Sequence, residues 1–156
     1  VELYPSKAPV TVANFLKYVD VHLYDSSSFF RAVTLNNQPK DSVKIEVIQG
    51  GDVDSVKEFA PIFLETTKQT GLQHKDGTIS MARGKPATAT SSFFFCINDQ
   101  PSLNFEGKRN KDGQGFAAFG KVVEGMNVVK KIQQLHPEQG QYFKPPVTII
   151  SITRLK

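Results

Sequence analysis

Arg31 is the first residue whose type and surroundings could do chemistry. It stands inside an apolar and aromatic stretch, Phe29-Phe30-Arg31-Ala32-Val33. A guanidinium is charged at every physiological pH, and burying it without a partner costs several kcal/mol. The residues alone leave two interpretations open. Arg31 either points outward from an alternating strand, or it faces a site where its N–H groups bind a ligand.

Two further segments place polar and small residues beside apolar runs. Gln49 closes one apolar run and is followed by Gly50-Gly51, which permits a tight turn or the close approach of another chain. The segment Gly77–Pro86 is rich in small residues, and an aromatic run over 93–95 follows it. Each segment also fits a purely structural interpretation, the first as a strand end and the second as a hairpin with core aromatics.

Other catalytic patterns are missing from the sequence. The three histidines, at positions 22, 74 and 136, have no partner at metal-binding spacing, and the single Cys96 excludes a disulfide framework and a cysteine-based zinc site. No serine stands in a G-x-S-x-G motif. The run Gly115–Lys121 resembles part of a phosphate-binding loop, but Val122 replaces the Ser or Thr that binds magnesium. We therefore expect no cofactor and no metal.

Two helices and a series of short strands must position these segments. Apolar spacing predicts one helix over 9–20, with Pro9 in its first turn, and a second over 125–135 that His136-Pro137 ends. Short β-branched or aromatic runs predict six strands, over 28–33, 45–49, 78–83, 93–97, 116–123 and 147–155. We expect a mainly β barrel with helical plugs, formed by one domain over 1–156. The long polar loops 34–44, 52–77 and 98–115 are expected to serve function.

Composition and charge exclude several classes of protein. The 156 residues are 39% hydrophobic and 22% charged, as is usual for soluble globular proteins. The net charge of +4 is spread without a basic block, so nucleic acid is not an expected partner. No apolar run approaches the ~20 residues of a membrane span. Because the chain begins at Val1 inside a strand-like stretch, we expect that an upstream segment has been removed or left out.

Five ordered motifs carry a resemblance to a known family. They are Phe-x-Arg (29–31), Ile-Gln-Gly-Gly-Asp (48–52), Gly-Thr-Ile-Ser-Met-Ala (77–82), Ser-Phe-Phe (92–94) and Phe-Gly-Lys-Val-Val-Glu-Gly-Met-Asn-Val-Val (119–129). Together with Asn14-Phe15-Leu16, they resemble a cyclophilin-type peptidyl-prolyl cis-trans isomerase over essentially the whole chain. The resemblance implies an eight-stranded antiparallel barrel closed by two helices. Val1–Tyr4 would belong to the second strand, so the first strand would be missing from this chain.

The resemblance also implies a set of site residues. Arg31 matches the catalytic arginine of the family, and Gln49 matches the glutamine that positions that arginine and the peptide. The matching substrate-binding positions are Phe30, Val47, Ala82, Arg83, Ser92, Phe94, Ser102, Leu103 and Phe116. Within this set, the backbone of Ala82 and Arg83 would bind the residue before proline, and Phe94 would form the floor of the proline pocket.

Four positions depart from the family pattern. Phe30 replaces a histidine beside the catalytic arginine, and Ser92 replaces a glutamine. Glu46 stands where a pocket phenylalanine is expected, and Ser102 stands where the better-known members carry tryptophan. Bacterial members often vary at these positions, so the chain resembles that branch. Because tight cyclosporin binders use that tryptophan, we expect weak cyclosporin binding here.

The function implied by the resemblance is rotation about X-Pro peptide bonds in assistance of protein folding. The alternative is a proline-binding module of the same fold with little turnover. The pair Arg31 and Gln49 favours the enzyme, whereas the altered pocket positions favour the alternative of a proline-binding module. Expected partners are proline-containing peptides and folding protein clients, bound by a monomer, with no membrane or nucleic acid. The resemblance favours a soluble protein of the bacterial periplasm over the cytoplasm.

Overall fold

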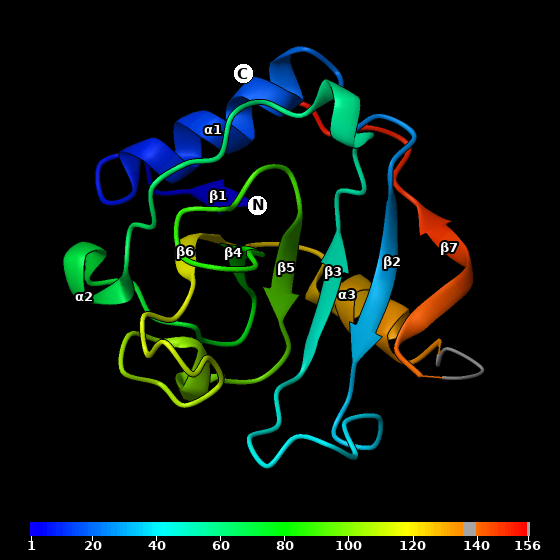
Figure 1. Cartoon of the computed structure of the whole chain (residues 1–156). Coiled ribbons are helices and arrows are strands. Elements are labelled where there is room, and N and C mark those ends of the chain that lie inside the picture. Colours follow the sequence, from blue (N-terminus) through cyan, green and yellow to red (C-terminus); the bar gives the residue numbers. More distant parts are fainter. Residues whose placement is uncertain (136–139, 156) are drawn as a thin grey trace.

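The computed structural model describes residues 1–135 and 140–155 and contains one antiparallel sheet of seven strands. The strands are β1 (Glu2–Leu3), β2 (Ser28–Val33), β3 (Val47–Gly50), β4 (Thr78–Met81), β5 (Phe93–Cys96), β6 (Ala117–Lys121) and β7 (Tyr142–Thr148). They follow the order β1-β6-β4-β5-β3-β2-β7, so β1 and β7 form the two edges (Figure 1). Within the described residues these edges are not paired with each other. The expected mainly β, antiparallel fold class is confirmed.

Both predicted helices are present. Helix α1 (Pro9–Asp20) runs across one end of the sheet, and α3 (Met126–Gln133) lies behind β2 and β3 (Figure 1). His136 and Pro137, expected to end the second helix, lie outside the described residues. No helix in the described part of the chain is long and apolar enough to cross a membrane.

The predicted loops contain short helical turns. Helix α2 (Thr67–Thr70) is one turn long, and 3-10 turns cover Ser55–Lys57 and Pro101–Leu103. A capping box stabilises α2, because Thr66 and Gln69 satisfy each other's backbone N–H groups. The 3-10 turn at Pro101–Leu103 presents the side chain of Leu103 to the pocket described below.

Five predicted strands are confirmed within two residues, but the prediction of the last strand is wrong. The sequence predicts a strand over 147–155, whereas β7 covers Tyr142–Thr148. Pro145 and Pro146 argue against a strand there, since proline cannot donate to a sheet ladder. Because β7 is an edge strand that, among the described residues, pairs only with β2, the missing N–H groups are tolerated. Beyond it, the chain leaves the sheet after the hydrogen bond from Ile149 N to Ser27 O.

The two faces of the sheet carry two separate apolar clusters. Successive strand residues point to opposite faces, so adjacent phenylalanines of β5 enter different clusters. Phe93 and Phe95 belong to the larger cluster, which also receives α1 and α3. Phe94 belongs to a smaller cluster with Val33, Ile45, Val47, Cys96 and Leu103. The polar pocket of the molecule forms over this smaller cluster.

A β-bulge in β2 turns Arg31 toward the smaller cluster. Phe29 pairs with Gly50 and Arg31 pairs with Gln49, so Phe30 is an extra residue on β2. In a regular strand, residues 29 and 31 would share one face. The bulge instead leaves Phe29 on the face of the larger cluster and aims Arg31 at the face of Phe94.

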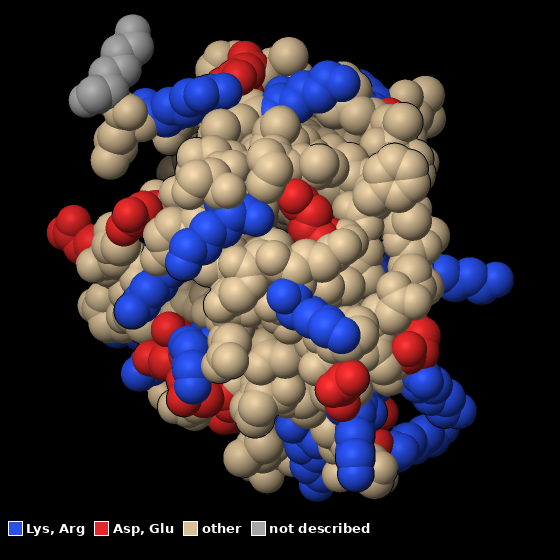
Figure 2. Space-filling view, turned by 90° about the vertical axis from the view of Figure 1, so that its left-hand side faces the viewer, with Lys and Arg blue, Asp and Glu red and all other residues tan. Residues whose placement is uncertain are grey.

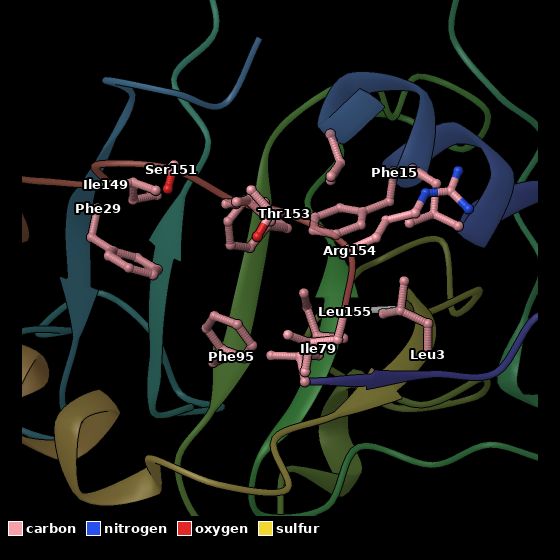
Figure 3. A pocket seen from close by; sticks show the side chains of 15 residues that line it. Leu3, Phe15, Phe29, Ile79, Phe95, Ile149, Ser151, Thr153, Arg154 and Leu155 are labelled. Carbon is pink, nitrogen blue, oxygen red and sulfur yellow. The ribbon is translucent and has the colours of Figure 1, made fainter. Parts of the chain in front are cut away.

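The larger cluster borders an open apolar cavity of about 580 Å³, whose lining includes residues of the central strands β4 and β5. Figure 3 shows Phe29, Ile79 and Phe95 pointing toward it from the sheet, with the C-terminal segment crossing above them. Leu3 of β1 and Leu155 lie beside Ile79, at the opposite end of this view from Phe29 (Figure 3). The cavity carries no converging set of polar side chains within the described residues, apart from Ser151, Thr153 and Arg154 of the C-terminal segment.

Candidate active site

A polar pocket of about 180 Å³ lies over β2, β3 and β5, on the face opposite the apolar cavity. Its lining consists of Arg31, Ile45, Val47, Gln49, Ala82, Arg83, Phe94, Leu103, Arg109 and Phe116. The pairing register of β2, β3 and β5 explains why several of these side chains lie together. Arg31 pairs with Gln49, and Gln49 pairs with Phe94, so three neighbouring strands place these side chains in one row. The row combines a charged donor, an amide and an aromatic ring.

Hydrogen bonds fix the orientation of Gln49 and, through it, one end of Arg31. Arg31 Nη1 donates to Gln49 Oε1 at 3.0 Å. The other end of that amide, Nε2, donates to Ser92 Oγ at 2.9 Å, and Ser92 Oγ donates to Gly50 O at 3.2 Å. Because a guanidinium has only donors, the carbonyl oxygen of Gln49 must face Arg31, which leaves Nε2 to donate to Ser92 Oγ.

A second glutamine binds the other edge of the same guanidinium. Gln141 Oε1 accepts from Arg31 Nε at 2.9 Å and from Nη2 at 2.7 Å. Gln141 immediately precedes β7, and its backbone oxygen accepts from Ala32 N at 2.9 Å. Burial lowers the pKa of Arg31 from its ordinary value, yet an arginine stays charged in the physiological range. The guanidinium is thus a fixed cation in a half-buried pocket.

Aromatic rings form the apolar part of the pocket. Phe94 is 5% exposed and meets Phe116 edge to face, with ring centroids 5.4 Å apart. His74 stacks on Phe94 with centroids 6.0 Å apart. His74 Nδ1 donates to Asn104 Oδ1 at 2.8 Å, and Nε2 accepts from Ser80 Oγ at 2.9 Å. Burial lowers the pKa of His74 to about 4, so it supports the floor as a neutral ring.

Two arginines from loops complete the wall. The Arg83 side chain is 1% exposed, pairs with Asp112 at 3.0 Å, and lies 5.1 Å from the ring centroid of Phe116. Arg109 donates to Val43 O at 2.7 Å and pairs with Asp41 at 3.6 Å. Arg83 ties the loop over 108–115 to the segment after β4, and Arg109 ties it to the loop over 34–44. Of the three long loops expected to serve function, only 98–115 lines the pocket, through Leu103 and Arg109, while 34–44 anchors Arg109 and 52–77 contributes no lining residue.

Charge elsewhere is mixed. Figure 2 shows Lys and Arg side chains interspersed with Asp and Glu on the face that it presents, without a field of one sign. Within the described residues, no group of three or more His, Cys, Asp or Glu side chains could hold a metal ion. The local chemistry of the pocket is that of a hydrogen-bond donor over an apolar floor.

Eight of the eleven expected site residues line the pocket, and the other three lie elsewhere. Ser92 lies behind Gln49 and binds it, and Phe30 stacks on Tyr142 with centroids 6.4 Å apart. Ser102 precedes Leu103 in the 3-10 turn and is not part of the lining.

Sequence reasoning missed Ile45 and Arg109 in the lining and Gln141 behind it. Glu46 is paired with Asn98 through a 2.8 Å hydrogen bond, so Ile45 supplies the apolar surface at that end of β3. The apolar character of Ile45 at the start of the predicted strand was a usable signal. No sequence signal marks Arg109 or Gln141, because each reaches the site from a loop that is distant in sequence from the strands of the pocket.

Comparisons with known proteins agree with this geometry. The family model of cyclophilin-type peptidyl-prolyl cis-trans isomerases matches residues 1–154. A peptidyl-prolyl cis-trans isomerase of Acinetobacter baylyi is 36% identical, over 97% of this chain and 77% of its own length. Peptidyl-prolyl cis-trans isomerase B of Escherichia coli is also 36% identical, over 85% of this chain and 75% of its own length.

A solved structure supports the fold independently. A crystal structure of a Cryptosporidium parvum cyclophilin-type peptidyl-prolyl cis-trans isomerase, obtained in the presence of the dipeptide Ala-Pro, superposes with a TM-score of 0.78. It is 22% identical, and the match covers 99% of this chain and 90% of that one. The fold, the family model and the identity to the bacterial relatives all indicate the same family. The chain belongs to the cyclophilin-type peptidyl-prolyl cis-trans isomerases, enzymes that catalyse rotation about X-Pro peptide bonds.

Proposed function

We propose that Arg31 catalyses X-Pro rotation by donating a hydrogen bond to the proline nitrogen as the peptide bond twists. Gln49 holds the guanidinium, and Phe94, Leu103, Phe116 and Val47 grip the proline ring. The observation that carries this proposal is the row of Arg31, Gln49 and Phe94 across three neighbouring strands, with Arg31 bound to Gln49 at 3.0 Å. It places a fixed cationic donor beside an apolar floor.

The reaction needs such a donor and little else. Amide resonance sets a rotational barrier of roughly 18–20 kcal/mol, and no covalent bond is made or broken. In the twisted state the nitrogen becomes pyramidal and gains a lone pair, which the planar amide lacks. A hydrogen bond from Arg31 to that lone pair forms only in the twisted state, so it lowers the barrier instead of tightening ground-state binding.

The size of the effect follows from the strength of a charged hydrogen bond. Such a bond contributes about 1.5–3 kcal/mol, and about 1.36 kcal/mol changes a rate tenfold. Arg31 would therefore supply roughly 10- to 150-fold. The remaining acceleration comes from the apolar pocket, because removing water from the amide disfavours its polar resonance form.

We also propose that the protein acts as a monomer on proline-containing segments of folding clients. The Ala-Pro dipeptide present with the Cryptosporidium parvum neighbour supports a short X-Pro unit as the ligand. The bacterial relatives support a bacterial setting, and we propose the periplasm as the compartment. Cell fractionation of the source organism with an antibody to this chain tests the compartment, and a cytoplasmic signal would contradict it.

The decisive experiment compares wild type, Arg31→Ala and Arg31→Lys in an assay with a short X-Pro peptide. We expect Arg31→Ala to lose at least roughly tenfold in kcat/KM and Arg31→Lys to recover only part, because an ammonium cannot copy the planar fork. The affinity for a ground-state proline peptide, measured by calorimetry, should fall less than turnover does.

Two results would overturn the proposal. Arg31→Ala turning over peptide at the wild-type rate would leave the acceleration to the apolar pocket alone. Wild-type protein that binds the peptide without measurable turnover would make the chain a proline-binding module.

A further inference from the structure

Gln141 is the partner of Arg31 with the most contacts to its guanidinium, and nothing in the sequence motifs points to it. One carbonyl oxygen, Gln141 Oε1, accepts from both Nε and Nη2, at 2.9 and 2.7 Å. An acceptor shared by these two N–H groups lies in the plane of the guanidinium and blocks its rotation. Gln49 accepts from Nη1 alone. Gln141 therefore restrains the guanidinium plane more than Gln49 does.

The orientation of Gln141 is itself determined by a loop. Its Nε2 donates to Asn37 O at 3.0 Å, so its carbonyl oxygen must face Arg31. Asn37 is in turn anchored, because its Nδ2 donates to Ala32 O at 2.9 Å and its Oδ1 accepts from Thr34 N at 2.8 Å. The loop over 34–44 thus holds the amide that holds the arginine.

Counting donors shows what this arrangement leaves for a peptide. A guanidinium has five N–H groups. Within the described residues, Gln141 takes two of them and Gln49 takes one. One N–H on each of Nη1 and Nη2 remains, and the two glutamines fix the direction in which both point. Without Gln141, Arg31 would keep a single side-chain acceptor and could swing about it.

We propose that Gln141, oriented by Asn37, is a positioning residue for prolyl isomerisation. It keeps the guanidinium of Arg31 aligned with the proline nitrogen of the twisted peptide. This inference rests on the proposed role of Arg31. It predicts that the effect of Gln141 passes through Arg31 and acts on turnover more than on binding.

The test is a double-mutant cycle between Gln141→Met and Arg31→Ala. Methionine keeps the length of the side chain and removes both polar groups. We expect Gln141→Met to lose roughly tenfold in kcat/KM, mostly in kcat, with ground-state peptide affinity nearly unchanged. In the Arg31→Ala background the same substitution should cost nothing further. Gln134→Ala, an exposed glutamine at the end of α3, is the matched control and should behave as wild type.

Gln141→Glu separates positioning from a structural role. A carboxylate can accept the same two N–H groups of Arg31, but it cannot donate to Asn37 O. We expect it to recover most of the activity that Gln141→Met loses. Recovery would support a contact with Arg31, whereas an equal loss in both variants would show that Gln141 acts through the loop and would overturn the proposal.

The remaining outcomes distinguish this inference from the proposed function. Wild-type activity of Gln141→Met beside an impaired Arg31→Ala overturns the inference alone. Wild-type activity of Arg31→Ala overturns the proposed function and the inference with it. Equal losses from Gln141→Met with and without Arg31 also overturn the inference. If Gln141→Met does not fold, Gln141→Ala replaces it in the cycle, and failure of both to fold would assign Gln141 to stability and overturn the proposal.

Discussion

The polar pocket and the apolar cavity lie on opposite faces of one sheet and are separated by β5. Phe94 points into the pocket, whereas its neighbours Phe93 and Phe95 line the cavity. The cavity is the larger, at about 580 Å³ against 180 Å³, yet its lining is mostly apolar, with polar side chains only from Ser151, Thr153 and Arg154 among the described residues. The pocket gathers a restrained arginine and a glutamine over an aromatic floor. The site proposed here as catalytic is therefore the smaller of the two hollows, and it is distinguished by its converging polar groups and not by its size.

The largest expected difference in activity between the two regions comes from substituting the adjacent residues Phe94 and Phe95 of β5. Phe95→Ala should lower the free energy of unfolding by about 3–5 kcal/mol, because its ring fills the larger cluster. Turnover by the folded fraction should stay close to wild type. Phe94→Ala, at a ring that is equally buried, should lie in the same range but also reduce kcat/KM by roughly tenfold or more, since it removes the pocket floor.

Denaturant melts and X-Pro peptide assays on both variants check this prediction. The comparison fails if Phe94→Ala keeps normal turnover while melting earlier, which would make Phe94 a core residue only. It also fails if folded Phe95→Ala is as inactive as Phe94→Ala.

Acid should destabilise the pocket side through His74. Burial depresses the pKa of His74 to about 4, below the ordinary value near 6.5 that applies in the unfolded chain. The unfolded state therefore binds the proton first, so the contribution of His74 is complete above about pH 6.5 and is lost as the pH falls toward 4. The loss amounts to about 3 kcal/mol over that window.

Urea melts between pH 7.5 and 4 measure this slope. His74→Gln should flatten it, whereas His22→Gln, at an exposed histidine outside both cavities, should leave it unchanged. A slope that survives His74→Gln would mean that another group titrates on folding.

Serines beside the two regions offer a smaller contrast. Ser102 adjoins the pocket residue Leu103, and Ser151 lines the apolar cavity. Ser102→Trp should tighten cyclosporin binding by roughly tenfold or more, because tryptophan adds an apolar wall and a donor. Ser151→Trp should leave that affinity unchanged. Calorimetry with cyclosporin measures the affinity of both variants and of the wild type. Nanomolar binding by the wild-type protein would contradict the weak binding expected here.

The smallest expected effect belongs to the arginine of the apolar cavity. Arg154 is half-exposed, and its Nε donates to Asp20 Oδ1 at 2.7 Å. This hydrogen bond from Arg154 holds the pKa of Asp20 below its usual range. Exposed ion pairs contribute little to stability. Arg154→Ala should therefore leave both kcat/KM and Tm nearly unchanged, in contrast to Arg31→Ala. A loss of activity comparable to that of Arg31→Ala would remove the distinction between the two regions.

The sequence by itself determined the elements and much of the pocket. Helical spacing placed α1, and short apolar runs placed β2 to β6, because burial of one face imposes a period that can be read locally. The family resemblance identified eight lining residues. Four of them, Arg31, Val47, Gln49 and Phe94, lie on strands whose register is determined by the same pattern. The last strand was misplaced, because edge position, which tolerates Pro145 and Pro146, is a property of the whole sheet.

Only the tertiary structure decided where Arg31 points and what holds it. Strand periodicity would place Phe29 and Arg31 on one face, and the bulge at Phe30 becomes visible only in the pairing with β3. Gln141 lies 110 residues away along the chain, so no local pattern connects it to Arg31. Register shifts and loop closure bring them together, and both depend on the free energy of the assembled sheet instead of the preferences of any one segment.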